Sequence, residues 1–204
     1  MRKKSFIVLF AVCIGVIVAS SLIFKNRVLH TKDFNTDESS QIQINPFLSY
    51  SCDESLNESL QSYIDKVPDY VLSDIQSIGY QMELVEEAGA DFQLIGVCGV
   101  TDINDKRILI QAKESKFRRS VVHEIFHAYD DYLSFISESS EFKEIYETEK
   151  ENFKVCDYHS THYLSNVREY FAEACQEYIY HPDDLKANTP RTYEFDKGCI
   201  NRVR

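Results

Sequence analysis

Residues 123–127 of the chain read His-Glu-Ile-Phe-His, so two histidines lie four positions apart with a glutamate beside the first. On a helix, positions four apart share a face one turn apart, and both imidazoles can reach one zinc ion. Glu124 is not itself a ligand in this arrangement, and it can take a proton from a zinc-activated water and deliver it to the departing amine of a peptide. The pattern therefore indicates metal-dependent hydrolysis, with His123 and His127 on the metal and Glu124 as the general base.

A catalytic zinc of this kind needs a third protein ligand and an open position for water. Glu169 is the best candidate, because it lies in a helical stretch well downstream of the two histidines. Glu173 shares its face and can accept the outer N–H of a ligand histidine, which fixes the tautomer of that ring. The alternatives are two core histidines beside a solvated glutamate, and two exposed carboxylates on an amphipathic helix. We favour the metal because burying two histidines and a glutamate in an apolar helix is unfavourable without a partner.

The surrounding segments predict the elements that position these residues. Helical spacing of apolar residues is found over residues 53–67, 69–78, 115–129, 141–152, 166–180 and 189–199. Short apolar runs separated by turn residues, typical of strands, are found over residues 82–85, 92–100 and 107–110. These patterns predict an α+β domain in which a small sheet packs on the helix with the two histidines, followed by a C-terminal helical part.

A peptidase must also hold its substrate in an extended conformation. The strand expected at Arg107–Gln111, just before the histidine helix, is placed to offer a free edge for backbone hydrogen bonds. A strand in the interior of the sheet would show the same sequence pattern.

The N-terminus has three basic residues, Arg2 to Lys4, followed by an almost unbroken apolar run from Phe6 to Phe24. This run is about long enough to cross a bilayer, so residues 1–28 are expected to be a signal peptide or an N-terminal transmembrane anchor. The positive-inside tendency then places the rest of the protein outside the cell, secreted or anchored to the outer face of the membrane. Residues 29–50 are expected to be a polar linker, and residues 51–204 a single metallopeptidase domain.

Acidic residues outnumber basic residues by 33 to 22, which gives a formal net charge of -11. This charge repels phosphate backbones, and no basic patch is large enough to override it, so we expect no nucleic-acid partner. Five cysteines follow the apolar run without a Cys-x-x-Cys pair, which argues against a structural zinc knuckle and leaves disulfides or free thiols open. The expected partner is a protein or peptide substrate, with membrane contact only through an uncleaved N-terminal segment.

Two motifs in combination resemble a known family. Residues 123–132, HEIFHAYDDY, and residues 169–174, EYFAEA, are similar to the anthrax lethal factor-like (ATLF-type) zinc metallopeptidases, which include the secreted clostridial Pro-Pro endopeptidases. Residues 187–195 also resemble the C-terminal segment of that family, so the likeness covers about residues 107–195. It implies a zincin fold and one zinc ion held by the two histidines and Glu169, with Glu124 as the general base.

The resemblance also implies a tyrosine that donates a hydrogen bond to the oxyanion of the tetrahedral intermediate. The family pattern places it seven positions before the third ligand, where this chain has His162. With the intervening loop one residue shorter the role falls to Tyr163, and His162 is then an alternative donor or an accessory group. A polar-aromatic loop over residues 158–163 with no part in catalysis is the remaining interpretation.

The sequence thus predicts an extracytoplasmic zinc-dependent endopeptidase. One alternative is a catalytically inactive zincin-fold binding module or toxin component, against which the intact Glu124 and the three intact ligands argue. The other is a metal-dependent hydrolase of a cell-wall amide. Nothing in the sequence identifies the natural substrate, and a preference for proline is raised by the resemblance alone.

Overall fold

The computed structural model of the protein describes residues 48–49, 53–157 and 161–201. The expected signal or anchor segment, residues 1–28, and nearly all of the expected linker lie outside these described residues. In the described part, no helix combines the length and the apolar character that crossing a bilayer requires.

Helices alternate with a small group of strands along the chain. The helices are α2 (Glu54–Ile64), α3 (Asp69–Ser77), α4 (Glu114–Tyr132), α5 (Ser140–Glu149), α6 (Val167–Tyr180), α7 (Pro182–Asn188) and α8 (Pro190–Ile200). The strands are β1 (Leu48–Ser49), β2 (Gln81–Val85), β3 (Gly99–Asp102) and β4 (Arg107–Gln111). Short 3-10 helices are η1 (Ala90–Phe92), η2 (Ile136–Glu138) and η3 (His162–Leu164). This content confirms the predicted α+β class.

The four strands form one sheet in the order β1-β2-β4-β3. Strands β1, β2 and β4 are parallel, and β3 runs antiparallel to β4. Apolar residues pair in register where β2 and β4 meet, with Met82 beside Ile108 and Leu84 beside Ile110. The expectation that the strand at 107–111 has a free edge is wrong, because β4 is paired on both sides. Strand β3 is an edge strand instead, and β1 is the other.

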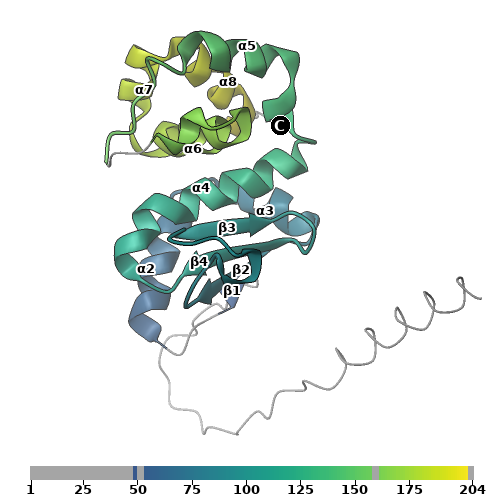
Figure 1. Cartoon of the computed structure of the whole chain (residues 1–204), viewed down its shortest axis with the longest axis vertical. Helices are drawn as coiled ribbons and strands as arrows, with labels where there is room; N and C mark the ends of the chain where they lie inside the picture. Colours follow the sequence, from purple (N-terminus) through teal and green to yellow (C-terminus); the bar gives the residue numbers. More distant parts are fainter. Residues whose placement is uncertain (1–47, 50–52, 158–160, 202–204) are drawn as a thin grey trace, which may run out of the picture. The chain divides into compact units, whose positions relative to one another are not determined.

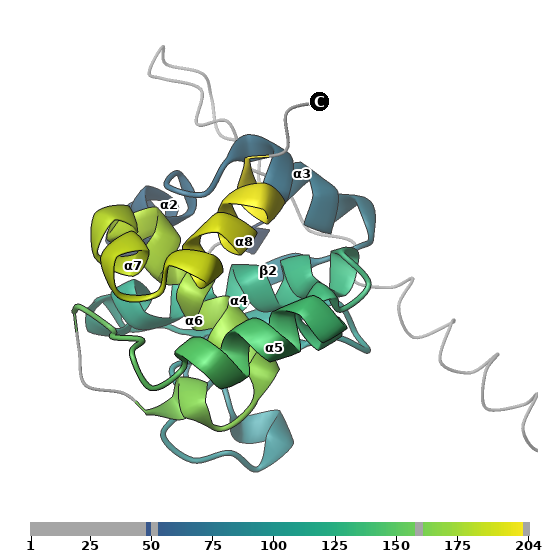
Figure 2. The ribbon, with the colours of Figure 1, turned by 90° about the horizontal axis from the view of Figure 1, so that it is seen from above.

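Helix α4 is the central layer of the domain. It packs on α2, α3 and the strands β3 and β4 on one side, and on α6 on the other. Figure 1 shows α4 lying across the sheet, with α5 to α8 stacked beyond it. Seen from above in Figure 2, α5, α7 and α8 lie over α6 and α4. The predicted arrangement, a small sheet on the histidine helix with a C-terminal helical part, is confirmed.

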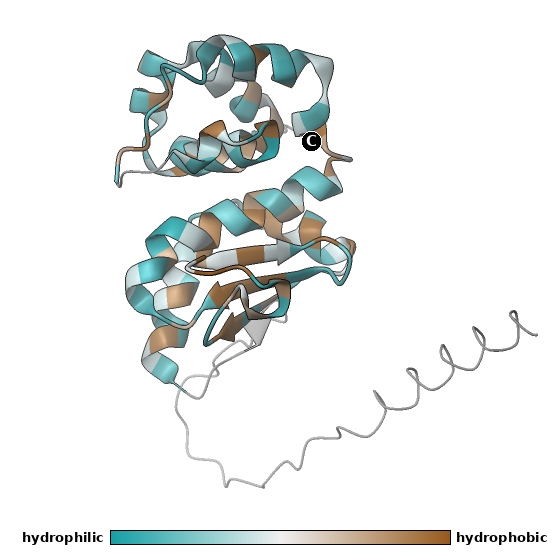
Figure 3. Cartoon of the chain, in the orientation of Figure 1, coloured by the Kyte–Doolittle hydropathy of each residue, from teal (hydrophilic) through white to brown (hydrophobic). Residues whose placement is uncertain are grey.

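The apolar residues of α4 explain why this helix lies between two layers. Its fully buried side chains point to both sides of the helix and are Phe117, Val121, Val122, Ile125, Phe126, Ala128 and Tyr129. A helix that is apolar on most of its circumference must be covered on more than one face. Figure 3 shows apolar colours along the strands and much polar colour on the outer helices. Four polar residues of this helix are nevertheless buried, Ser120, His123, Glu124 and Asp130, and each requires a reason.

The segment before β3 differs from the prediction of a strand over residues 92–100. Only Gly99 and Val100 of that range belong to β3. Gln93 and Gly96 have positive φ angles of 57° and 77°, which interrupt an extended strand, and Ile95 is 99% exposed. The apolar residues of this segment have the sequence pattern of a buried strand, but their side chains do not enter the core. Cysteines 98, 156, 175 and 199 of the described part are free thiols.

Candidate metal centre and active site

Helix α4 directs His123 and His127 toward one point. Their Nε2 atoms are 3.1 Å apart, and the two rings stand nearly perpendicular with their centroids 4.7 Å apart. The four-residue spacing places both rings on the face of α4 that meets α6. His123 is buried, with 8% of its surface exposed, so its imidazole contacts mainly protein atoms rather than solvent.

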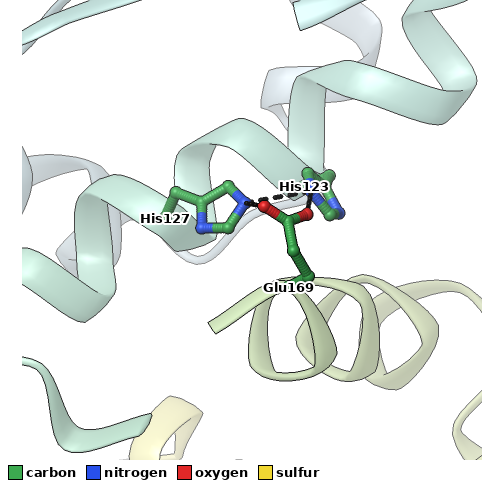
Figure 4. A group of neighbouring side chains, drawn as sticks. All are labelled: His123, His127 and Glu169. Carbon is green, nitrogen blue, oxygen red and sulfur yellow. Dashed lines mark hydrogen bonds and ion pairs between the residues drawn. The ribbon is translucent and has the colours of Figure 1, made fainter. Parts of the chain in front are cut away.

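Glu169 reaches the same point from the first turn of α6. Its carboxylate oxygens lie 3.3 Å from the Nε2 of His123 and 3.5 Å from the Nε2 of His127 (Figure 4). The turn is fixed by Asn166, whose side-chain oxygen accepts hydrogen bonds from the backbone N–H groups of Arg168 and Glu169. An N-cap of this kind sets where the helix begins and therefore where its first carboxylate points.

The three ligand atoms fit a zinc ion. Tetrahedral zinc holds nitrogen and oxygen ligands at about 2.0–2.1 Å, which separates the ligand atoms by about 3.3–3.4 Å. The observed separations within the group of His123, His127 and Glu169 are 3.1, 3.3 and 3.5 Å. Two imidazoles and one carboxylate are also the donor set that a catalytic zinc uses when it keeps one position open.

Glu173 supports the first histidine from behind. Its Oε2 lies 3.1 Å from the Nδ1 of His123, the ring nitrogen on the side away from Glu169. A carboxylate in this position fixes the orientation and the tautomer of a ligand imidazole. Glu173 itself is only 3% exposed, which keeps this interaction out of water. The structure thus places the Glu173 carboxylate beside the Nδ1 of His123, and its supporting role stays a prediction.

The charges of this group are strongly coupled. Burial opposes protonation of His123, but the carboxylates of Glu169 and Glu173 outweigh it and raise the pKa of the imidazole well above its ordinary value. Burial would raise the pKa of Glu169, but the two imidazoles lower it well below its ordinary value. The carboxylates thus create a potential that attracts positive charge, which a divalent cation satisfies.

Glu124 lies beside the two histidines and is held by strand β3. The hydroxyl of Thr101 is 2.8 Å from Oε2 of Glu124 and 2.9 Å from its carbonyl oxygen. Gly99 is so close that a β-carbon at that position would stand 2.6 Å from Cγ of Glu124. Strand β3 therefore leaves room for this side chain and also orients its carboxylate.

A cleft of about 610 Å³ opens over these residues. Its walls come from the segment before β3, from β3 itself, and from the facing turns of α4 and α6. His123, Glu124, His127 and Glu169 all line it, so both the ligand atoms and the carboxylate of Glu124 are accessible from one opening. A cleft with a few convergent polar groups is the usual form of a catalytic site.

The structure separates the two candidates for the oxyanion donor. His162 lines the cleft, with its Nε2 at 3.3 Å from the Glu169 carboxylate and a side chain that is 69% exposed. The hydroxyl of Tyr163 donates to the carbonyl oxygen of Phe153 at 3.2 Å, and its ring packs against the Phe153 ring. Tyr163 is not among the residues that line the cleft.

Three residues of the site were missed by the sequence interpretation. Asn166 could have been found, because an asparagine followed by a glutamate three residues later is a helix-start pattern. Gly99 and Thr101 had no local signal, because each meets Glu124 across more than twenty positions of sequence.

The fold and the site together define a class of protein. A helix with the His-Glu-x-x-His pattern, packed on a small sheet and facing a glutamate from a second helix, is the arrangement of the zincin-like metallopeptidases. The family model described as anthrax toxin lethal factor, N- and C-terminal domain, matches residues 96–199, just over half of the chain. The chain belongs to this family, which confirms the resemblance found in the sequence.

A solved structure shares the fold. The Pro-Pro endopeptidase PPEP-2 from Paenibacillus alvei superposes with a TM-score of 0.58 and 24% sequence identity, over 74% of this chain and 95% of that chain. None of the curated proteins compared with the chain matches it. Family and fold together indicate a protease-like function.

Proposed function

We propose that the protein is a zinc-dependent endopeptidase that hydrolyses peptide bonds outside the cytoplasm. The observation that supports this most directly is the convergence of His123, His127 and Glu169 on one point, with ligand atoms 3.1–3.5 Å apart, in a cleft that also contains Glu124. A core histidine pair would need no carboxylate from a second helix and no opening to solvent.

The ligands and their support have separate tasks. His123, His127 and Glu169 would hold the zinc ion, and Glu173 would keep the His123 ring in place through its Nδ1. When bound, zinc lowers the pKa of a water molecule to about 7 and polarises the carbonyl group of the substrate.

Glu124 moves the proton in this reaction. Its carboxylate takes a proton from the attacking water as the water oxygen bonds to the peptide carbon, and it then gives that proton to the nitrogen of the leaving amine. Thr101 positions the carboxylate for both transfers through the contact at 2.8 Å. Only 7% of the Glu124 surface is exposed, so its carboxylate is held in place where it lines the cleft.

His162 is the better placed of the two candidates for stabilising the oxyanion. Its ring faces the cleft beside Glu169, whereas the hydroxyl of Tyr163 is used by the Phe153 carbonyl. An imidazole N–H in the cleft can donate to the oxygen on which negative charge develops. Tyr163 would reach that position only by breaking its present hydrogen bond.

Strand β3 is the proposed backbone contact for the substrate. It is one of the two edge strands of the described sheet, and its residues Gly99, Val100 and Thr101 line the cleft. An extended peptide can add to such an edge through main-chain hydrogen bonds, which binds it without regard to most side chains. This role replaces the one predicted for the strand at 107–111.

The location outside the cytoplasm rests on the N-terminal sequence. Three basic residues precede an apolar run that is about long enough to cross a bilayer, and this order favours export of the downstream domain. The domain boundaries proposed from the sequence, residues 1–28, 29–50 and 51–204, rest on the same reasoning.

The test uses the full-length protein, purified in mild detergent and incubated with a peptide library. Wild type is expected to cleave internal peptide bonds, and a chelator should stop cleavage until zinc is restored. Glu124→Gln should keep its zinc and lose cleavage by several orders of magnitude. An active Glu124→Gln variant would disprove the assigned base. Release of products from isolated cell-wall material, with no peptide cleaved, would instead support an amide hydrolase of the wall.

A second comparison assigns the oxyanion donor. His162→Ala is expected to lower kcat by about 100-fold with a small change in KM, because removing one donor to a developing oxyanion has an effect of this size. Tyr163→Phe should leave kcat almost unchanged, since its hydroxyl serves the Phe153 carbonyl. The reverse result would return the role to Tyr163.

A further inference from the structure

A second group of metal-ligating side chains lies at the other end of α6. Cys156 in the segment after α5, His181 between α6 and α7, and Asp184 in α7 each offer one ligand atom, and these atoms all lie within 4.8 Å of one another. Glu169 is in the first turn of α6, and His181 directly follows the last residue of that helix. Twelve residues of helix separate the two groups by about 18 Å, so they cannot share one ion.

The chemistry of this group suits a borderline-soft cation. A thiolate, an imidazole and a carboxylate are the ligands that zinc takes from proteins. A further carboxylate is close by: Glu177, one turn before His181, is 1% exposed and its Oε2 accepts from the backbone N–H of Cys156 at 3.4 Å. The cluster is thus a mixed set of donors drawn from two segments that are far apart in sequence.

His181 has two charged neighbours at one ring nitrogen. Its Nε2 lies 3.1 Å from the carboxylate of Asp157 and 3.1 Å from the guanidinium of Arg118. Ligand imidazoles commonly engage a carboxylate through one ring nitrogen and the metal through the other. Nε2 faces both Asp157 and Arg118, so Nδ1 is the ring nitrogen that neither of these two contacts uses.

Negative charge exceeds positive charge around the thiol. Arg118 is paired with Asp157 and stacks on the ring of Tyr180. In the described part of the chain, no lysine or arginine nitrogen lies within 4.0 Å of the carboxylates of Glu177 or Asp184. A divalent cation would relieve this excess and bind the thiolate form.

We propose that Cys156, His181 and Asp184 bind a second divalent transition-metal ion, zinc in the first instance, with Glu177 or water as the fourth ligand. Ligand atoms around tetrahedral zinc are about 3.4–3.6 Å apart, so binding would draw together any pair that is now separated by more than this, within the 4.8 Å limit of the group. Cys156 and Asp184 are exposed, which leaves their side chains free to make that movement.

The second ion would affect the first site indirectly, by holding a segment that leads to it. It would tie the segment around Cys156, which leads to η3 and its cleft residue His162, to the junction of α6 and α7. A closed site with protein ligands stabilises the fold that forms it. The ion is therefore structural, and its presence does not depend on whether the protein cleaves peptides.

The test counts bound metal in the full-length protein and reads its ligands. Zinc content after dialysis should be two equivalents in wild type and one in Cys156→Ser and in Asp184→Asn. Cobalt substituted for zinc should give a sulfur-to-cobalt charge-transfer band in the near ultraviolet, because only the second site has a thiolate. Cys98→Ser is the matched control, since Cys98 belongs to no ligand group found in the described residues.

Each outcome either supports or overturns the second metal site. A thiolate band that persists in Cys98→Ser and in the double variant His123→Ala, His127→Ala, but disappears in Cys156→Ser, establishes the second site apart from the first. One equivalent of zinc in wild type with no thiolate band overturns the proposal, as does a band that Cys156→Ser retains. Melting temperatures check folding: the deficit of Cys156→Ser should appear with zinc and vanish in chelator.

Discussion

Gly99 lies against Glu124 so closely that any side chain at position 99 would occupy the space of this glutamate, the proposed general base. A β-carbon there would stand 2.6 Å from Cγ and 2.9 Å from Oε1 of Glu124, both well inside van der Waals contact. The glutamate must therefore move if Gly99 is replaced, and a misplacement of about 1 Å in a catalytic group reduces turnover by about 100-fold.

We predict that Gly99→Ala lowers kcat by about 100-fold while the zinc content stays at the wild-type level. The matched control is Gly198→Ala in α8, where a β-carbon meets nothing within 4 Å. That change should leave kcat unaltered and stabilise the helix by about 0.5–1 kcal/mol. Steady-state kinetics with metal analysis checks both variants, and full activity in Gly99→Ala would show that the glutamate is positioned differently.

Thr101 orients the same carboxylate from the next inward position of the edge strand. Its hydroxyl contact with Oε2 of Glu124 is 2.8 Å, and a hydrogen bond to a charged group contributes about 1.5–3 kcal/mol. Thr101→Val, which keeps the shape and loses the hydroxyl, should lower kcat by about 10- to 100-fold with little change in KM. Thr101→Ser should restore most of the activity. Equal losses in the valine and serine variants would point to packing rather than to the hydroxyl.

The sequence predicted the features that depend on local periodicity. The spacing of His123 and His127 and the helical pattern around Glu169 were sufficient to place three ligands on two helices, and the structure brings their ligand atoms together. Local sequence patterns could not decide between His162 and Tyr163. The choice depends on whether the loop before Glu169 is one residue shorter than in the family pattern. Tyr163 as the oxyanion donor stays a prediction, although the contact of its hydroxyl with the Phe153 carbonyl favours His162.

Strand order and long-range contacts also could not be predicted from the sequence. Whether the strand at 107–111 lies inside the sheet or at its edge is decided by β3, which pairs with it on the side opposite β2. Apolar residues near Ile95 imitated a buried strand although they lie at the surface. Helix α7 is short and begins at Pro182, a favourable first helical residue that gave too brief a pattern to detect.

Glu173 offers a test of the metal centre that does not rely on activity. Because its carboxylate holds the Nδ1 of His123 at 3.1 Å, Glu173→Gln should weaken zinc binding by about 10-fold or more. Competition with a chromogenic chelator measures this affinity. Glu141→Gln, on the exposed first turn of α5, is the charge-matched control and should bind zinc as wild type does. Unchanged affinity in Glu173→Gln would contradict the supporting role.

Asp196 makes stability depend on pH. It is fully buried in α8, and burial raises its pKa well above the ordinary value, so the folded state holds the proton more tightly than the unfolded state. This contribution to stability is complete below the unfolded pKa of about 3.9 and is lost as pH rises, at about 1.4 kcal/mol per unit for one proton.

Asp196→Asn removes that titration. The free energy of unfolding of the variant, relative to wild type, should therefore increase from pH 4 toward pH 7. Urea denaturation at several pH values measures the difference, with chelator present in all samples so that zinc binding does not enter. A difference that is constant with pH would show that Asp196 is ionised in the folded protein.

Glu149, which lies in α5, caps the N-terminus of helix α8. Its carboxylate, at the end of α5, accepts from the backbone N–H groups of Arg191 and Thr192 at 3.0 and 2.8 Å, and from the Thr192 hydroxyl at 2.8 Å. The residue at the N-cap position of α8, Thr189, provides no side-chain cap, so Glu149 satisfies the donors that the helix leaves open.

Glu149→Ala should lower the free energy of unfolding by about 3 kcal/mol, because the buried N–H and hydroxyl of Thr192 and the part-buried N–H of Arg191 lose a charged acceptor at once. Glu147→Ala, two residues earlier on the exposed face of α5, is the control and should have little effect. Since α8 packs on α6, the same loss should also make the first site less rigid, and zinc should leave Glu149→Ala faster than wild type. Urea denaturation and the rate of zinc release to a chelator measure the two effects, and stability equal to that of Glu147→Ala would refute the capping role.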